Sequence, residues 1–474
     1  MSIDPREKVV IFIDGANLYA TSKAIGIDIG TSGCKGVLVS FPDGQVLKSA
    51  RRSYTLHAEG NRAEHEPEDW IRAVEAILKD LGPADAIGMD GMMHSEVCID
   101  GNGKATGRAI LWCDGRSEAE CAEINRKVGA ALLRKTVGNM AFAGFTLPHL
   151  LWRKKNKQLK GTAVALCKDY VRARLTGELR QEISDASGMI TWHLSKKRWA
   201  TEVLRKVGID PKLFPPPVGS HEIAGKWNGI PVVGGAADNA AAAVGLGVVR
   251  KGQAVASMGT SNVLLAVHDK PVVDPKMRVH TFAHAVPGKF LQLGCMLTGT
   301  RSFDWILKVV GENVENAPIA DDSKGLLFAP YLVGERTPYA DTSVRGMFAG
   351  LSPDHDKSHF VRAVMEGTAF ALRDAQEIMK ATSVRVTGGG MKSPVWRQII
   401  ADVLGIPVTT VNTSDEGAAF GSAILAGVGV GAFKTVEQAT DETVKETSVT
   451  KPQRSYDKEY ARFKRLYPAA KSLV

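Results

Sequence analysis

The sequence predicts an α/β protein of two domains, each built on a sheet that opens with a strand, a tight turn and a hairpin. At 474 residues, the chain is too long for one ordinary hydrophobic core. An apolar strand runs into a Gly-Thr-Ser turn twice, at residues 28–33 (DIGTSG) and 258–262 (MGTSN). Alternating strand and helix patterns follow each turn. We therefore predict domains of residues 24–248 and 249–474.

Two segments compete to be the opening strand. Each is an apolar strand that runs into a turn containing Asp. They are residues 9–19 (VVIFIDGANLY) and residues 24–40 (AIGIDIGTSGCKGVLVS). Only the second continues into a hairpin, with a turn at residues 42–44. The first resembles the opening strand of a NYN-type nuclease domain, but Asp14 has no acidic partners downstream with which to hold a metal. We expect residues 1–23 to be an extension that is dispensable for the activity of the remaining chain.

Strands and helices alternate along the remaining chain. A helix over residues 70–81 precedes a strand, turn and strand over residues 84–100. The middle third is mostly helical, and a second apolar strand near residue 231 enters a Gly/Ala-rich turn and helix. The hairpin pattern restarts at residues 254–267 (AVASMGTSNVLLAV).

Composition indicates a globular cytoplasmic protein. Hydrophobic residues make up 44% and charged residues 23% of the chain. No apolar run approaches the roughly 20 residues that span a bilayer, and the N-terminus lacks a secretory signal. The cysteines show neither CxxC pairs nor metal-ligand spacing, so we expect buried, reduced, inert thiols at Cys34, Cys98, Cys113, Cys121, Cys167 and Cys295.

The net charge of +9 does not indicate nucleic-acid binding. The basic clusters of the chain are small, at residues 153–155 and 196–198, and the sequence contains no arginine-rich block. A mildly basic surface suits an enzyme that handles polyphosphates. We expect small-molecule partners and neither nucleic acid nor membrane, and the sequence leaves the oligomeric state open, a homodimer included.

The first Gly-Thr-Ser turn has the chemistry of a phosphate-binding loop. Its glycines let the backbone approach phosphate oxygens, its hydroxyls can donate hydrogen bonds, and Asp28 at the strand end can hold Mg²⁺ through water. Taken alone, a structural Asp-Gly turn would explain the same residues. The candidate phosphate-binding residues are Gly30, Thr31, Ser32 and Lys35 here and Gly259, Thr260 and Ser261 in the second turn.

Two further motifs follow apolar strands. Asp238 and Asn239, in GGAADNAAAAVG, lie in a turn of small residues where a carboxylate can reach a ligand. The alternative is that Asp238 caps the Ala-rich helix, since Asp is a favoured N-cap. Glycines 388–390 follow the strand near residue 385, and there Gly389 and Gly390 would let a nucleotide lie against bare backbone.

In this order the motifs resemble those of the FGGY carbohydrate kinases, over roughly residues 24–470. The longest matches are residues 346–367 (GMFAGLSPDHDKSHFVRAVMEG) and residues 328–338 (FAPYLVGERTP), which we interpret as architectural. The resemblance implies two actin-like ATPase (ribonuclease H-like) domains flanking a deep catalytic cleft. It further implies ATP and Mg²⁺ as cofactors, with Asp238 as the base and Asn239 as a sugar contact.

Within the family, the substrate motifs look most like those of the xylulose kinases. Met93 and His94 match in GMMHS, as do Trp112 and Asp114 in ILWCDGR, whereas Met92 replaces the usual Gln. The resemblance implies ATP-dependent phosphorylation of a primary sugar hydroxyl, D-xylulose to D-xylulose 5-phosphate first. A kinase for another pentulose or gluconate, and a non-catalytic sugar- or nucleotide-binding relative, stay open.

Overall fold

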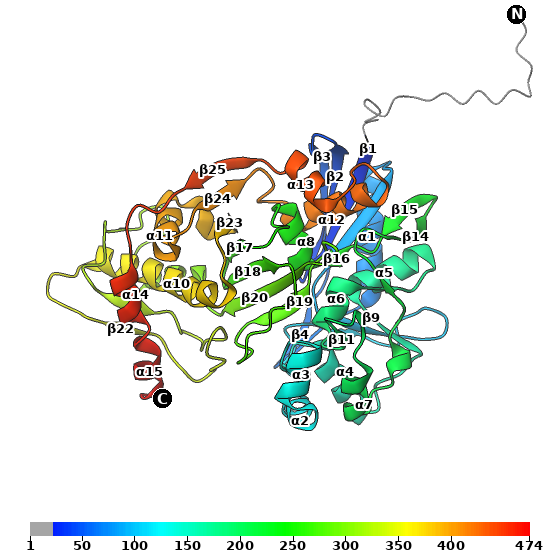
Figure 1. Ribbon diagram of the computed structural model, residues 1–474, viewed down its shortest axis with the longest axis horizontal. Helices are drawn as coiled ribbons and strands as arrows, with labels where there is room; N and C mark the ends of the chain where they lie inside the picture. Colours follow the sequence, from blue (N-terminus) through cyan, green and yellow to red (C-terminus); the bar gives the residue numbers. More distant parts are fainter. Residues whose placement is uncertain (1–21) are drawn as a thin grey trace, which may run out of the picture.

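The computed structural model describes residues 22–474, which form two bodies of sheet and helix (Figure 1). The NYN-like segment of residues 9–19 lies outside these residues. The first strand, β1 (Ser22–Ile29), starts slightly earlier than expected and includes the last two residues of the predicted extension. Residues of the later of the two candidate segments therefore form β1 of this sheet.

The first sheet contains the predicted hairpin. Its order is β14-β15-β6-β1-β2-β3, with β16 also paired to β6. β1 is antiparallel to β2 and parallel to β6, and its apolar residues Ile25, Ile27 and Ile29 are buried. The other strands are β2 (Gly33–Phe41), β3 (Val46–Ser53), β6 (Ala86–Gly91), β14 (Ile223–Trp227), β15 (Ile230–Val233) and β16 (Ala236–Ala237).

The second sheet repeats this arrangement, which confirms the internal repeat that the two turns predict. Its order is β19-β20-β18-β17-β23-β24-β25. β17 is antiparallel to β18 and parallel to β23, as β1 is to β2 and β6. The strands are β17 (Gln253–Met258), β18 (Asn262–His268), β19 (His280–Ala283), β20 (Phe290–Met296), β23 (Ser383–Thr387), β24 (Val408–Val411) and β25 (Glu446–Thr450).

Smaller sheets extend the two bodies. A five-stranded sheet runs β4 (His57–Glu59), β5 (Arg62–His65), β8 (Ala109–Ile110), β7 (Glu96–Ile99) and β9 (Ala163–Leu166). Three two-stranded pairs join β10 (Gln181–Glu182) to β13 (Pro217–Val218), β11 (Trp192–His193) to β12 (Arg198–Trp199), and β21 (Leu327–Ala329) to β22 (Met347–Ala349).

The helix predicted over residues 70–81 is present as α1, which begins slightly earlier. α1 begins with Pro67 at its first position and buries the face that carries Trp70 and Val74, while Asp356 and His359 form a capping box at the start of α10. The first half contains α1 (Pro67–Leu81), α2 (Glu118–Val128), α3 (Ala130–Thr136), α4 (Thr146–Lys155), α5 (Cys167–Thr176), α6 (Ile183–Gly188), α7 (Thr201–Val207), the 3₁₀ helix η1 (Pro211–Leu213) and α8 (Asp238–Gly245).

The second half contains α9 (Thr300–Val310), α10 (Lys357–Met379), η2 (Gly389–Lys392), α11 (Pro394–Leu404), α12 (Gly417–Gly429), α13 (Val436–Thr443), α14 (Asp457–Phe463) and α15 (Leu466–Lys471). Within residues 22–474, none of the helices combines the length and the apolar character that crossing a bilayer requires.

Helix α12 comes from the second half of the sequence but packs against the first sheet. A Cβ atom on Gly26 of β1 would lie 1.8 Å from the carbonyl oxygen of Ala419, and one on Gly88 of β6 would lie 2.1 Å from that of Ser422. Only glycine permits so close a contact between helix and sheet. The boundary near residue 248 falls between α8 and β17 and stays a prediction.

The cysteines are free thiols, and two of them depart from the expectation of burial. Cys113 is exposed and Cys295 is half-buried, whereas the other four are buried. Cys113 lies in the loop after β8, between Trp112 and Asp114, where the chain turns at the surface. Neighbouring protein atoms still desolvate the Cys113 thiol in part and raise its pKa above the usual value, so this cysteine is also not activated.

Candidate active site

Three carboxylates meet where parallel strands of the first sheet end. Asp28 on β1 is paired in register with Asp90 on β6. Ala237 on β16 is paired with Gly91, which places Asp238 beside the same strand ends. Because the carboxyl ends of parallel strands share one edge of a sheet, residues that are far apart in sequence form one site.

Asp28 lies beside a second, fully buried carboxyl group. Burial raises the pKa of Asp28, while hydrogen bonding to Asp90 and the charge of Lys35 act in the opposite direction. Burial also raises the pKa of Asp90, and the neighbouring charge of Asp28 raises it further. The Ser422 hydroxyl of α12 donates to Asp90 Oδ2 at 2.7 Å, so the helix that covers the first sheet also contacts the site.

Two hydrogen bonds constrain the backbone of the turn after β1. The Gly30 N–H donates to the Gly33 carbonyl at 3.1 Å, and the Tyr54 hydroxyl donates to the Gly30 carbonyl. The Trp112 indole N–H donates to Thr31 Oγ1 at 3.0 Å, which joins this turn to the predicted sugar-binding residues. Ser32, at the tip of the turn, is exposed.

Lys35 is engaged away from the turn. Its ammonium donates to the Asp415 carbonyl oxygen at 2.8 Å and forms an ion pair with Glu416, just before α12. In this arrangement the cation that we predicted to bind phosphate joins β2 to the start of α12.

Asp238 is the first residue of α8, and Ala237 occupies the N-cap position. Asp238 Oδ1 accepts hydrogen bonds from the Asn239 backbone N–H at 2.7 Å and from Asn239 Nδ2 at 2.9 Å. Burial raises the pKa of the Asp238 carboxyl to about 7, and the charge of Asp28 also raises it. A carboxylate with a pKa near neutrality is suited to accept a proton during catalysis.

His94 is neutral and its orientation is constrained. Its backbone lies in the left-handed region (φ 68°), and its ring stacks on Phe145 with ring centres 4.3 Å apart. Nδ1 lies 2.8 Å from the Gly188 carbonyl oxygen, which can only accept, so Nδ1 carries the proton. Burial lowers the pKa of His94 to about 3. Nε2 is thus an acceptor, available to a ligand hydroxyl.

A cavity of about 200 Å³ combines these groups with residues from the second half of the chain. Asp238 and Asn239 line it together with Ser261 of the second Gly-Thr-Ser turn. The remaining lining residues are Met93, His94, Trp112, Phe142, Gly144, Phe145, Val263, His280, Phe282, Leu293, Cys295 and Arg336. The two halves of the chain thus share one pocket.

Asp114 and Met92 lie outside this cavity. The Asp114 carboxylate accepts from the Ala63 N–H at 2.7 Å and pairs with the Arg116 guanidinium, also at 2.7 Å. Met92 is buried in the core of the first body. Asp114 therefore supports the loop that carries Trp112, and Met92, which stands where the family usually has Gln, is a core residue.

The two nucleotide-binding candidates of the second half lie side by side. The turn of residues 259–261 follows β17, and Gly388 follows β23, the parallel neighbour of β17. Gly388 has φ 95°, and a Cβ atom there would lie 2.5 Å from the Met258 carbonyl oxygen, so only glycine fits. Gly389 faces open space, which leaves room for a ligand against the backbone.

The sequence prediction missed several residues of the site. Asp90 follows the same kind of apolar strand as Asp28, and that similarity was the available signal. Arg336 belongs to a stretch that we interpreted as architectural, yet it lines the cavity and lies 6.0 Å from the Phe142 ring centre. In residues 22–474 its guanidinium has no carboxylate partner within ion-pair distance.

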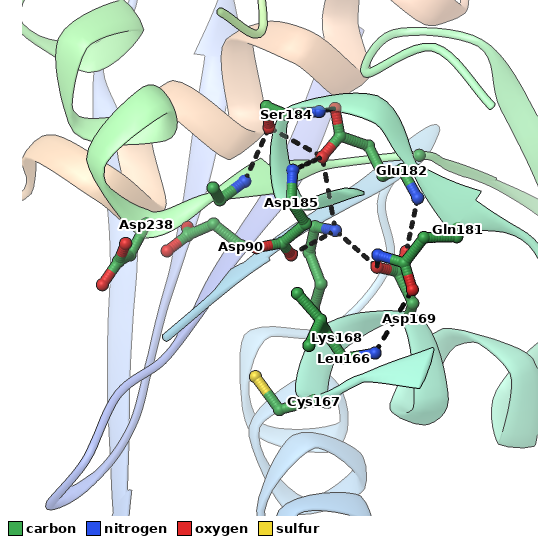
Figure 2. A network of polar contacts seen from close by, with 12 residues as sticks. Asp90, Leu166, Cys167, Lys168, Asp169, Gln181, Glu182, Ser184, Asp185 and Asp238 are labelled. Carbon is green, nitrogen blue, oxygen red and sulfur yellow. Dashed lines mark hydrogen bonds and ion pairs between the residues drawn. The ribbon is translucent and has the colours of Figure 1, made fainter. Parts of the chain in front are cut away.

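A buried ionic network lies behind Asp238 (Figure 2). The Lys168 ammonium is 2.7 Å from Asp185 and 2.9 Å from Asp169, and it lies 3.5 Å from Glu182. Arg172 pairs with Asp169 at 2.5 Å and donates to the Gly234 carbonyl at 2.7 Å. All of these side chains are buried, so each charge depends on its partners.

We expect Lys168→Met to destabilise the protein strongly. Removing one partner of a buried ion pair leaves uncompensated charge and costs roughly 3–5 kcal/mol. Thermal unfolding should show the midpoint of Lys168→Met falling by several degrees. Lys155→Met removes a surface lysine that is 42% exposed and pairs with Glu120 and Glu123, so it is a matched control worth at most about 1 kcal/mol. Equal thermal midpoints for the two variants would show that Lys168 does not compensate the charge of the buried carboxylates.

Comparison with known proteins identifies relatives along almost the whole chain. Residues 23–245 and 254–430 match models of the N-terminal and C-terminal domains of the FGGY family of carbohydrate kinases. A xylulose kinase from Bacillus subtilis is 34% identical, with 95% of this chain and 97% of the relative covered.

Solved structures match the fold equally well. A xylulose kinase from Rhodospirillum rubrum superimposes with a TM-score of 0.87 at 27% identity, covering 95% of this chain and 99% of the other. A gluconate kinase from Lactobacillus acidophilus gives 0.86 at 25% identity, covering 96% and 98%. These matches confirm the predicted pair of actin-like domains.

Proposed function

Because the chain belongs to the FGGY family of carbohydrate kinases, we propose that it transfers the γ-phosphoryl group of ATP to a primary hydroxyl of D-xylulose, giving D-xylulose 5-phosphate. The observation that carries this proposal is the shared cavity. It combines Asp238, a base candidate with a pKa near neutrality, with a neutral His94 and with Ser261 from the second half. The names of the relatives favour xylulose as the sugar.

In this mechanism Asp238 accepts the proton of the attacking hydroxyl. His94 Nε2 accepts a hydrogen bond from another sugar hydroxyl, Asn239 and Trp112 line the same cavity, and Arg336 donates from the second half. The turn residues Gly30, Thr31, Ser32, Gly259, Thr260 and Ser261 hold phosphate oxygens with N–H and hydroxyl donors. Closure of the two halves excludes water and so limits hydrolysis of ATP.

The residues present fit Mg²⁺ held mainly by substrate. No group of three His, Cys, Asp or Glu residues in the described chain is placed to hold a metal ion. Mg²⁺ typically takes one or two protein carboxylates together with phosphate oxygens and water, which suits Asp28 with Asp90 beside it. When bound, the ion would neutralise charge on the β- and γ-phosphates.

The substrate is tested by measuring ADP release across ketopentoses, polyols, aldohexoses and D-gluconate. We expect the highest kcat/KM with D-xylulose, because the acceptor at His94 and the donor at Arg336 complement the hydroxyls and carbonyl of a ketose. D-Gluconate is the second candidate, since a related structure is a gluconate kinase and Arg336 could also pair with a carboxylate. A preference for glycerol or an aldohexose would contradict the proposal.

His94→Ala provides the control for this panel. It removes the ring that stacks on Phe145 and should raise KM for the sugar while leaving KM for ATP within about twofold, since the nucleotide contacts are elsewhere. A change confined to KM for ATP would show that His94 does not contact the sugar.

A further inference from the structure

The strand segment that precedes Asp238 is held at both ends by buried side chains. The Gly234 carbonyl accepts from Arg172 at 2.7 Å, and the Ala237 N–H donates to Ser184 Oγ at 2.9 Å. Ala237 directly precedes Asp238, so the orientation of its peptide determines where the Asp238 side chain begins. Ser184 thus contacts the peptide N–H of the residue that directly precedes the base candidate (Figure 2).

The orientation of the Ser184 hydroxyl is itself determined by its neighbours. It donates to Glu182 Oε2 at 2.7 Å, so its oxygen lone pairs are free to accept from Ala237. Glu182 Oε1 accepts from the Ser184 N–H and from the Ser220 hydroxyl, each at 2.7 Å. The Lys168 ammonium, 3.5 Å from Glu182 Oε2, balances the charge of that carboxylate.

We propose that Ser184 is a positioning residue for phosphoryl transfer: its hydroxyl, oriented by Glu182, holds the Ala237 peptide so that the Asp238 carboxylate faces the attacking sugar hydroxyl. The inference rests on the proposed role of Asp238 as the base. A misplacement of reacting groups by about 1 Å can cost about 10²-fold in rate. Loss of this hydrogen bond should therefore lower kcat without removing any group that contacts sugar or ATP.

The same helix supplies a matched control. Ser187, like Ser184, is fully buried on α6. Its hydroxyl accepts from the Ala283 N–H at 2.9 Å and donates to the Ser184 carbonyl at 2.6 Å. Ser187→Ala and Ser184→Ala therefore each delete one buried hydroxyl with one donated and one accepted hydrogen bond, but only Ser184 contacts the segment before Asp238.

The test is steady-state kinetics of the full chain with D-xylulose and Mg-ATP. We expect Ser184→Ala to lower kcat at least tenfold, with both KM values within about twofold of wild type. Ser184→Cys keeps the size of the side chain but accepts hydrogen bonds weakly, so its kcat should lie between those of Ser184→Ala and wild type. Ser187→Ala should lower the thermal midpoint about as much as Ser184→Ala while kcat stays within about twofold. Because Ser184 acts through Asp238, adding Ser184→Ala to Asp238→Asn should cause little further loss.

Each contrary outcome has a distinct meaning. Wild-type kcat in both Ser184 variants, equal kcat losses at Ser184 and Ser187, or fully additive losses in the double variant would overturn the positioning role. If Asp238→Asn alone retains normal turnover, the proposed base is wrong, whatever the Ser184 variants do. Should Ser184→Ala fail to fold, the comparison of Ser184→Cys with Ser187→Ala decides the question.

Discussion

Asp238→Asn should lower kcat with D-xylulose by about 10²–10⁴-fold, the usual contribution of a general base. The asparagine keeps the size of the side chain and can still accept from Asn239, but it cannot take a proton. Calorimetric binding of Mg-ATP should stay close to wild type, because the nucleotide-binding turns do not depend on this carboxylate. A folded Asp238→Asn enzyme with near-normal turnover would leave Asp238 only a structural role at the start of α8.

The pH dependence of the wild-type enzyme provides an independent check on Asp238. Its carboxyl has a pKa raised to about 7, so it is protonated, and unable to act as a base, at lower pH. The kcat should therefore fall as the pH is lowered through about 7. The residual activity of Asp238→Asn should lack this dependence, and a wild-type profile that is flat down to pH 5 would contradict the assignment.

Asp28→Asn should lower kcat by about 10²–10³-fold through a different route, namely the loss of electrostatic stabilisation of the transferred group. Because Asp28 is proposed to hold Mg²⁺, the Mg²⁺ concentration that gives half-maximal rate should rise in this variant. Titration of activity with Mg²⁺ measures the change. Asp238→Asn, whose half-maximal Mg²⁺ concentration should equal that of the wild type, is the control. A rate loss in Asp28→Asn with unchanged Mg²⁺ dependence would show that Asp28 does not act through the metal.

Local patterns were enough to predict the elements that carry the site. The hairpin after β1, the turn of residues 259–261 and the position of Asp238 at the start of α8 all follow from apolar runs that end in small or polar residues. The prediction of a shared phosphate-binding geometry also followed from sequence, because the two Gly-Thr-Ser turns repeat at the start of each sheet.

What sequence patterns could not provide were contacts between distant segments. Asp90 joins the site only because β6 pairs with β1 in one particular register. Lys35 looks available for phosphate in sequence, yet Glu416, remote along the chain, lies beside it. Asp114 matches a sugar-binding motif, but its buried carboxylate accepts a hydrogen bond at 2.7 Å from the N–H of Ala63, which is remote along the chain. In each case pairing across the fold outweighs the local motif.

The position of α12 has a consequence for how the protein is made. β1 and β6 emerge early from the ribosome, but the helix that fills the space over Gly26 and Gly88 is translated near the end of the chain. At usual rates of synthesis this delay is on the order of tens of seconds. During that interval the face of the first sheet over Gly26 and Gly88 lacks α12, and its apolar strands are exposed to incorrect contacts with other segments. We therefore expect the nascent chain to need chaperones until residues 417–429 have left the ribosome.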